Sequence, residues 1–175
     1  MKKFLALLLC ILMAFCVVAC DKKKDKNSSD DEEGGNSNKP QQTVSFSVSY
    51  NSTKIALGAD AKAIIATLGE PASKQEAGSC AGQGTLTKYK YPSLEIYVLT
   101  NGNVQTIDQI TLLDDGIKTP EGIKIGSSAD DVTKACGKAT KQTETYMTYS
   151  SGKKTLQFQF RDGAVVGIDY RMVTN

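Results

Sequence analysis

The sequence predicts an α+β domain in which two tandem helix-plus-three-strand repeats form an antiparallel sheet with short helices on one face, preceded by one extra strand. Three observations predict it. The same order of elements occurs twice, each copy begins with a short capped helix, and tight turns join the strands that follow. Strands joined by tight turns are antiparallel, and helices this short must pack on one face of the sheet. We expect the first repeat over about residues 52–116 and the second over about 120–173.

The repeat is visible when the chain is aligned with itself at an offset of 68 residues. Each copy alone has about 55 residues and would be marginally stable, so we expect the two copies to share one core. The segments that match at this offset are Ile55-Ala56-Leu57-Gly58 with Ile123-Lys124-Ile125-Gly126, and Gly69 with Gly137. Further along, at shorter offsets, Leu94-x-Ile96-x-Val98 corresponds to Leu156-x-Phe158-x-Phe160, Asn101-Gly102-x-Val104 to Asp162-Gly163-x-Val165, and Ile107 to Ile168.

Each copy begins with a helix whose ends are marked by capping residues. Asp60 can cap a helix over Ala61–Leu68, which Gly69 ends and Pro71 prevents from continuing. In the second copy, Ser128 and Asp131 have the spacing of a capping box, and Gly137 ends that helix.

Seven strands are predicted around these helices. Strict alternation of apolar residues with serine indicates a leading strand over 44–50, with Val44, Phe46, Val48 and Tyr50 on one face. The dipeptides Asn101-Gly102 and Asp162-Gly163 are typical of tight hairpin turns. The expected strands of the repeats cover 86–91, 94–99 and 104–113 in the first copy, and 143–149, 154–161 and 164–172 in the second.

Residues 1–19 are predicted to be a lipoprotein signal peptide. Lys2 and Lys3 precede an uncharged apolar run over residues 4–19, and these 16 residues are short for a spanning helix, which needs about 20. The run ends in Val17-Val18-Ala19-Cys20, which resembles the lipobox of bacterial lipoproteins. The resemblance implies cleavage before Cys20 and its modification by acyl chains such as palmitate, which anchor the protein to the extracytoplasmic face of the cell membrane. An ordinary signal peptide and an uncleaved anchor are the alternatives.

Residues 20–43 are predicted to be the lipidated cysteine followed by a disordered polar tether. The segment after Cys20 has no large apolar residue, so it cannot bury enough surface to offset the entropy of ordering. A flexible chain of about 23 residues has an r.m.s. reach of roughly 25–30 Å. The folded domain, expected over 44–175, would therefore float near the membrane.

Composition argues against several classes of function. The chain has no histidine, which excludes Ser-His-Asp and Cys-His nucleophile systems and histidine-ligated metal sites. It has no tryptophan, and its 7% of aromatic residues supply few stacking partners for nucleic acid. Without Lys2 and Lys3 the 21 basic residues fall to 19, equal to the 19 acidic residues, so nothing indicates a nucleic-acid partner. We expect no cofactor, no metal and no enzymatic activity.

Two sets of residues are candidates for roles beyond packing. Cys80 and Cys136 form an even pair that indicates a disulfide outside the cytoplasm, but Cys136 aligns with Leu68 and equally fits a small core residue. Tyrosine gives binding area at low entropic cost, and its alternative role is half-buried packing on a sheet. The candidate binding surface consists of Tyr89, Tyr91, Tyr97, Tyr146 and Tyr149.

The helix and turn residues of the two copies resemble a known group of proteins. Leu68-Gly69-x-Pro71 in the first copy and Ile123-Lys124-Ile125-Gly126-Ser127-Ser128-x-Asp130-Asp131-Val132 in the second are similar to the small tandem-repeat lipoproteins of Gram-positive bacteria. These are related in architecture to β-lactamase-inhibitor protein and to the small outer-membrane-assembly lipoprotein. The resemblance covers about residues 52–172 and implies a non-enzymatic binder that uses a sheet face or loops.

The function expected from these features is that of a membrane-anchored module that binds a protein or an envelope component. An inhibitor of an extracytoplasmic enzyme, similar to β-lactamase-inhibitor protein, is the first alternative. A weak hydrolase or a ligand-delivery lipoprotein is the second. A binder should present an exposed face, an inhibitor a protruding loop, and an enzyme converging polar groups in a cleft.

Overall fold

The stretches of alternating apolar and polar residues form strands, and the two capped segments form helices. The computed structural model describes residues 43–78 and 84–173, all of which belong to the compact unit Asn38–Asn175. The predicted signal peptide, Cys20, nearly all of the predicted tether and Cys80 lie outside the described residues. In the described part of the chain, no helix is long and apolar enough to cross a membrane.

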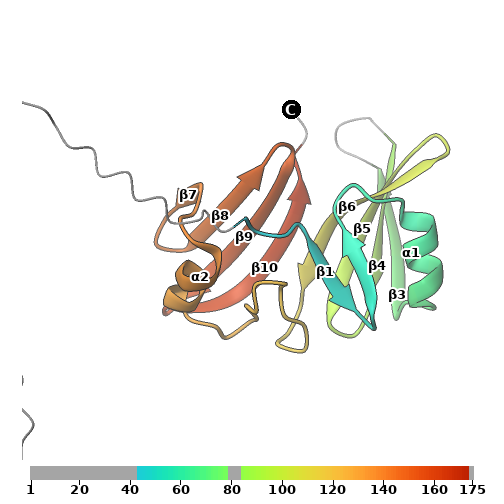
Figure 1. Ribbon diagram of the computed structural model, residues 1–175. Helices are drawn as coiled ribbons and strands as arrows, with labels where there is room; N and C mark the ends of the chain where they lie inside the picture. Colours follow the sequence, from blue (N-terminus) through green and yellow to red (C-terminus); the bar gives the residue numbers. More distant parts are fainter. Residues whose placement is uncertain (1–42, 79–83, 174–175) are drawn as a thin grey trace, which may run out of the picture. The chain divides into compact units, whose positions relative to one another are not determined.

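The fold is α+β, with two short helices, an eight-stranded antiparallel sheet and a two-stranded hairpin (Figure 1). The strands of the sheet lie in the order β3-β4-β5-β6-β10-β9-β8-β7, so that β6 and β10 join its two halves. The elements are β1 (Ser47–Tyr50), β2 (Thr53–Ala56), α1 (Ala61–Leu68), β3 (Ser73–Gly78), β4 (Thr85–Lys90), β5 (Leu94–Asn101), β6 (Val104–Leu112), α2 (Ala129–Cys136), β7 (Lys141–Gln142), β8 (Tyr146–Ser151), β9 (Lys154–Arg161) and β10 (Ala164–Met172).

Both predicted helices and their caps are confirmed. The Asp60 carboxylate accepts a hydrogen bond of 2.9 Å from the Lys62 N–H at the start of α1. At the start of α2, Ser128 and Asp131 each accept a bond from the other's backbone N–H, both at 3.1 Å, which completes the capping box. Gly69 and Gly137 end the two helices with φ angles of 78° and 74°, a region that favours glycine.

Three strands were not predicted. The leading strand is one arm of a hairpin, because β2 returns beside β1 through a tight turn at Asn51-Ser52. Both turn residues have positive φ, 48° and 63°, as a type I′ turn requires. The other two are β3 and β7, so each helix is followed by four strands rather than three. Neither β3 nor β7 alternates apolar with polar residues, and each forms as the partner of one neighbouring strand.

One hairpin turn differs from its predicted position by one residue. Asn101 pairs with Val104, so the central residues of the β5–β6 turn are Gly102-Asn103 rather than Asn101-Gly102. Gly102 has a φ of 58°, and a glycine at the first central position suits a type II′ turn. The turn at Asp162-Gly163 lies where it was predicted.

The two halves of the sheet carry a bulge at matching places. The Gly58 N–H donates to the Ile107 carbonyl and the Gly126 N–H to the Val165 carbonyl, both at 2.8 Å, next to the register shifts in β6 and β10. Val165 therefore occupies the position of Ile107, so the predicted matches of Val104 with Val165 and of Ile107 with Ile168 are each wrong by three residues. Eight residues separate the paired Val98 and Ile107, and four separate Phe160 and Val165, so the β5–β6 hairpin extends further.

One face of the sheet is buried along all its central strands. Residues directly opposite each other in an antiparallel pair point to the same side. Ile96 on β5 lies opposite Ile110 on β6, which lies opposite Tyr170 on β10, and all three are 0% exposed. Both helices and the β1–β2 hairpin contribute to the same core, through Ala61, Val132, Cys136, Val48 and Ile55.

Candidate functional site

The opposite face of the eight-stranded sheet is covered by neither helix nor by the hairpin in the described part of the chain. We call it the open face and define it by residues that alternate with the core residues along each strand. None of these residues is buried. They are Gln75 and Ala77 (β3), Leu86 and Lys88 (β4), Glu95, Tyr97 and Leu99 (β5), Gln109 and Thr111 (β6), Asp169 and Arg171 (β10), Thr155, Gln157 and Gln159 (β9), and Tyr146 and Thr148 (β8).

Strand register arranges these side chains in rows that run across the sheet. Because side chains opposite each other lie about 4.5–5.5 Å apart, each row is a continuous line of neighbours. One row is Gln75, Lys88, Tyr97, Gln109, Arg171 and Thr155, and the next is Glu95, Thr111, Asp169, Gln157 and Thr148.

A first polar cluster lies on β4 and β5 and centres on Glu95. One carboxylate oxygen of Glu95 accepts a hydrogen bond of 3.0 Å from the Tyr97 hydroxyl, and the other lies 3.4 Å from the Lys88 ammonium. The Glu95 side chain is 14% exposed, so its charge is compensated within the sheet rather than offered to solvent. Burial, and then the bond to Glu95, raise the pKa of Tyr97 to about 12. The bond to Glu95 holds the phenol in one orientation.

A second polar cluster lies where the halves of the sheet meet, and it centres on Asp169. The Thr111 hydroxyl donates to the Asp169 carboxylate at 2.7 Å, and the Gln109 amide donates to Thr111 at 3.0 Å. The Arg171 guanidinium lies 3.7 Å from the same carboxylate oxygen of Asp169. Further along this face, the Gln157 amide donates to the Thr148 hydroxyl at 3.2 Å. The open face is thus rich in amides and hydroxyls, and its carboxylates at Glu95 and Asp169 are each paired with a cation.

The open face is hollowed next to Tyr97. The hollow has a volume of about 550 Å³ and is lined by Gln75, Glu76, Ala77, Leu86, Lys88 and Tyr97. Ala77 and Leu86 give this region apolar walls, which the second polar cluster lacks. An apolar group of a ligand has room here, with the Lys88 ammonium and the Gln75 amide beside it.

The structure does not bring the five candidate tyrosines together. Tyr97 and Tyr146 lie on the open face, in different halves of the sheet. Tyr89 lies on the core side, opposite Ile96. Tyr91 and Tyr149 are 3% and 4% exposed, so both are packed into the core rather than available to a partner.

The candidate disulfide involves one described cysteine. Cys136 ends α2, is 2% exposed and is not bonded to another cysteine of the described residues. Burial, and then the charge of Glu121, raise the pKa of this thiol to about 12, which makes it a poor nucleophile. Cys80 lies outside the described residues, so its pairing with Cys136 stays a prediction, as does lipidation of Cys20.

Sequence reasoning missed the amide and hydroxyl residues of the open face. None of these residues was predicted as a candidate, because amides and hydroxyls have no intrinsic reactivity. They include Gln109, Thr111, Gln157 and Thr148. The alternation Thr155-Leu156-Gln157-Phe158-Gln159-Phe160 contained the signal, since the polar members of such a strand face away from the core.

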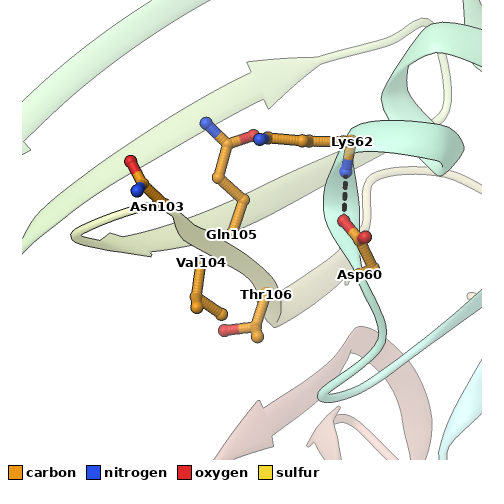
Figure 2. A pocket seen from close by; sticks show the side chains of 6 residues that line it. All are labelled: Asp60, Lys62, Asn103, Val104, Gln105 and Thr106. Atoms are coloured by element: carbon orange, nitrogen blue, oxygen red, sulfur yellow. Dashed lines mark hydrogen bonds between the residues drawn. The ribbon is translucent and has the colours of Figure 1, made fainter.

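A smaller hollow of about 240 Å³ lies between the tip of the β5–β6 hairpin and the start of α1. Figure 2 shows Lys62 and Gln105 extending toward each other there, while Val104 points to the other side of the hairpin. The Asp60 carboxylate is already engaged with the Lys62 N–H. The carboxylate that lines this hollow therefore serves as the N-cap of α1.

Neither metal chemistry nor similarity to known proteins adds a further site. Within residues 43–78 and 84–173, no group of three or more His, Cys, Asp and Glu side chains could hold a metal ion. The chain matches no protein-family model, no curated protein and no solved structure.

Proposed function

We propose that this protein is a lipoprotein anchored to the extracytoplasmic face of the cell membrane, and that its domain binds a protein or an envelope component without catalysing a reaction. The open face is the observation that supports this proposal. A sheet that buries one face and leaves the other uncovered has a broad surface for a partner, and this surface has a hollow at one end.

The chemistry of the open face indicates what kind of ligand surface it would accept. Glu95 and Asp169 are neutralised by Lys88 and Arg171, so long-range attraction to a strongly charged partner is weak. Its amides and hydroxyls can each make further hydrogen bonds. A polar, nearly uncharged ligand surface with one apolar group for the hollow beside Tyr97 fits best.

We also infer that the two halves of the domain are tandem copies of one unit. The Tyr91 hydroxyl donates to the Gly69 carbonyl at 3.2 Å, and the Tyr149 hydroxyl donates to the Gly137 carbonyl at 3.1 Å. The matching bonds from Gly58 and Gly126 at the two bulges support the same inference. The open faces of the two copies would then form one surface that is twice as wide as either alone.

An enzyme inhibitor is the second candidate, and the β5–β6 hairpin favours it. This hairpin has four more residues than its counterpart β9–β10, two on each arm, and Val104 beside its turn is 62% exposed. Its tip is neither acidic nor aromatic, however, so the open face is the better candidate surface.

Site-specific photo-cross-linking in living cells tests the proposal. A photoreactive residue is placed at Gln157 on the open face, at Asn103 on the hairpin tip, or at the exposed Lys62 on α1 as the control. We expect one dominant partner at Gln157 and none at Lys62, with a weaker signal when Cys20→Ala removes the anchor. Dominant capture of a secreted hydrolase from Asn103 would favour the inhibitor. Equal labelling from Gln157 and Lys62 would contradict binding through the open face.

A further inference from the structure

The strand β3 forms an uncovered edge of the eight-stranded sheet. It pairs with β4 along all six residues, Ser73–Gly78, and in the described part of the chain no strand pairs with its outer side. All of its residues except Ser73 are exposed. The opposite edge, β7, has only two residues. Such an edge offers unpaired backbone N–H and C=O groups to another strand.

The charges on β3 are arranged around its midpoint. Lys74 and Glu76 lie on either side of Gln75, with their ammonium and carboxylate 3.0 Å apart. Both side chains point to the helix side of the sheet, because they lie opposite Tyr89 and Thr87. Gln75 and Ala77 point to the open face. Two such strands placed antiparallel can therefore offer a positive group to a negative one on each side of Gln75.

We infer that the β3 edge pairs with the β3 edge of a second copy of this chain, about a two-fold axis that passes beside Gln75. In this register Gln75 lies opposite the partner's Gln75, Lys74 lies opposite the partner's Glu76, and Ser73 lies opposite the partner's Ala77. The interface is self-complementary, as a two-fold dimer requires.

Charge favours this register over the two neighbouring symmetric ones. A two-fold antiparallel pair has one residue opposite its own copy at the axis. An axis at Lys74 would place two ammonium groups together, and an axis at Glu76 would place two carboxylates together, which is destabilising. An axis at Gln75 gives two opposite-charge pairs and, with the bond already present in each chain, a cluster of four alternating charges. Networks of this kind contribute more than isolated surface ion pairs.

The proposed dimer leaves the open faces available. The axis is perpendicular to the sheet, so both open faces lie on one side and both helix layers on the other. The hollows beside Tyr97, each partly walled by β3, become neighbours across the axis. Val44 packs into the core on the helix side. In the dimer, Val44 of both chains would therefore lie on the side opposite the open faces.

A single pair of six-residue strands buries less surface than a stable dimer normally needs. The dimer is therefore weak in dilute solution and is favoured at high local concentration, as on a membrane. Cross-linking at the axis is a suitable test, because it traps a weakly populated dimer.

The first experiment uses the full chain in detergent micelles with Cys80→Ser, and adds Gln75→Cys or Ala77→Cys. Opposed Gln75 positions have Cα atoms about 4.5–5.5 Å apart, within the range of a disulfide. Two Ala77 positions are offset by four residues, about 14 Å, which no disulfide spans. We expect disulfide-linked dimers from Gln75→Cys, few from Ala77→Cys, and cross-linking when Ala77→Cys is mixed with Ser73→Cys. Absence of dimers from Gln75→Cys, or equal yields from Gln75→Cys and Ala77→Cys, would overturn the inference.

The second experiment reverses charges in the Gln75→Cys background. Lys74→Glu places like charges opposite each other twice, and we expect the dimer yield to fall about tenfold. The double variant Lys74→Glu with Glu76→Lys restores two opposite-charge pairs, and we expect the yield to recover. Unfolding in urea serves as the control for folding. Equal yields from all three proteins would show that no such register forms.

Discussion

The hydroxyl groups of Tyr91 and Tyr149 close the ends of the two helices in the same way. Each phenol donates to the carbonyl of the glycine that follows its helix, Gly69 or Gly137. Both phenols are nearly inaccessible, so a lost bond is poorly replaced by water. We expect Tyr91→Phe and Tyr149→Phe each to lower the free energy of unfolding by about 1 kcal/mol.

Urea unfolding followed by circular dichroism measures these changes. The matched control is Tyr146→Phe, because Tyr146 is 37% exposed on the open face and its hydroxyl can bond to water. We expect its effect to be within about 0.5 kcal/mol. An equally large loss in Tyr146→Phe would mean that the helix ends are not the cause.

The thiol of Cys136 is protected both by burial and by its raised pKa. In a Cys80→Ser variant we expect this thiol to react with an aromatic disulfide reagent only as the protein unfolds, since the thiolate is the reacting form. The reaction in urea should appear at the unfolding midpoint. Rapid labelling of the folded variant at pH 8 would contradict this placement at the end of α2.

At the scale of elements, the N-cap contributes more to the stability of α2 than to that of α1. Ser128 and Asp131 satisfy two backbone N–H groups, whereas Asp60 satisfies one. We expect Ser128→Ala to lower the free energy of unfolding by about 1–2 kcal/mol, and Asp60→Ala to lower it by about 1 kcal/mol or less. Thermal unfolding of the two variants makes the comparison, and an unchanged midpoint for Ser128→Ala would refute it.

The elements predicted from sequence are those with local signals. Caps and a glycine stop placed α1 at Ala61–Leu68, and alternation placed β9 and β10 at their observed bounds. The strand β3 was missed because Ser-Lys-Gln-Glu-Ala-Gly has no apolar alternation, and an edge strand depends on its neighbour rather than on its own pattern. The turn at Gly102-Asn103 was predicted one residue too early because Asn-Gly is itself a strong turn signal. Only the pairing of Asn101 with Val104 distinguishes a turn centred on Gly102-Asn103 from one centred on Asn101-Gly102.

The candidate site was less predictable than the fold, for a reason that operates at the scale of the whole molecule. A strand pattern shows which residues share a face, but not which face the helices cover. Tyr89 and Tyr97 lie on neighbouring strands, yet on opposite sides of the sheet, because Tyr89 lies opposite Ile96. Only the register across all eight strands joins Tyr97, Gln109, Arg171 and Thr155 into one row.

Tyrosine burial also makes the stability of the whole domain depend on pH in the alkaline range. Burial raises the pKa of Tyr149 to about 12 from its ordinary value of 10.0, so between these values the folded chain holds a proton that the unfolded chain has lost. Stability is therefore fully present below pH 10 and falls as the pH rises toward 12. We expect the urea midpoint to decrease between pH 9.5 and pH 11.5, and to decrease less in Tyr149→Phe, which has no proton to lose at this position. Lysines and other buried tyrosines contribute to both proteins, so the difference between the two slopes isolates Tyr149. Identical slopes would mean that the Tyr149 phenol titrates as it does in water, which its contact with Gly137 and its burial against Phe158 argue against.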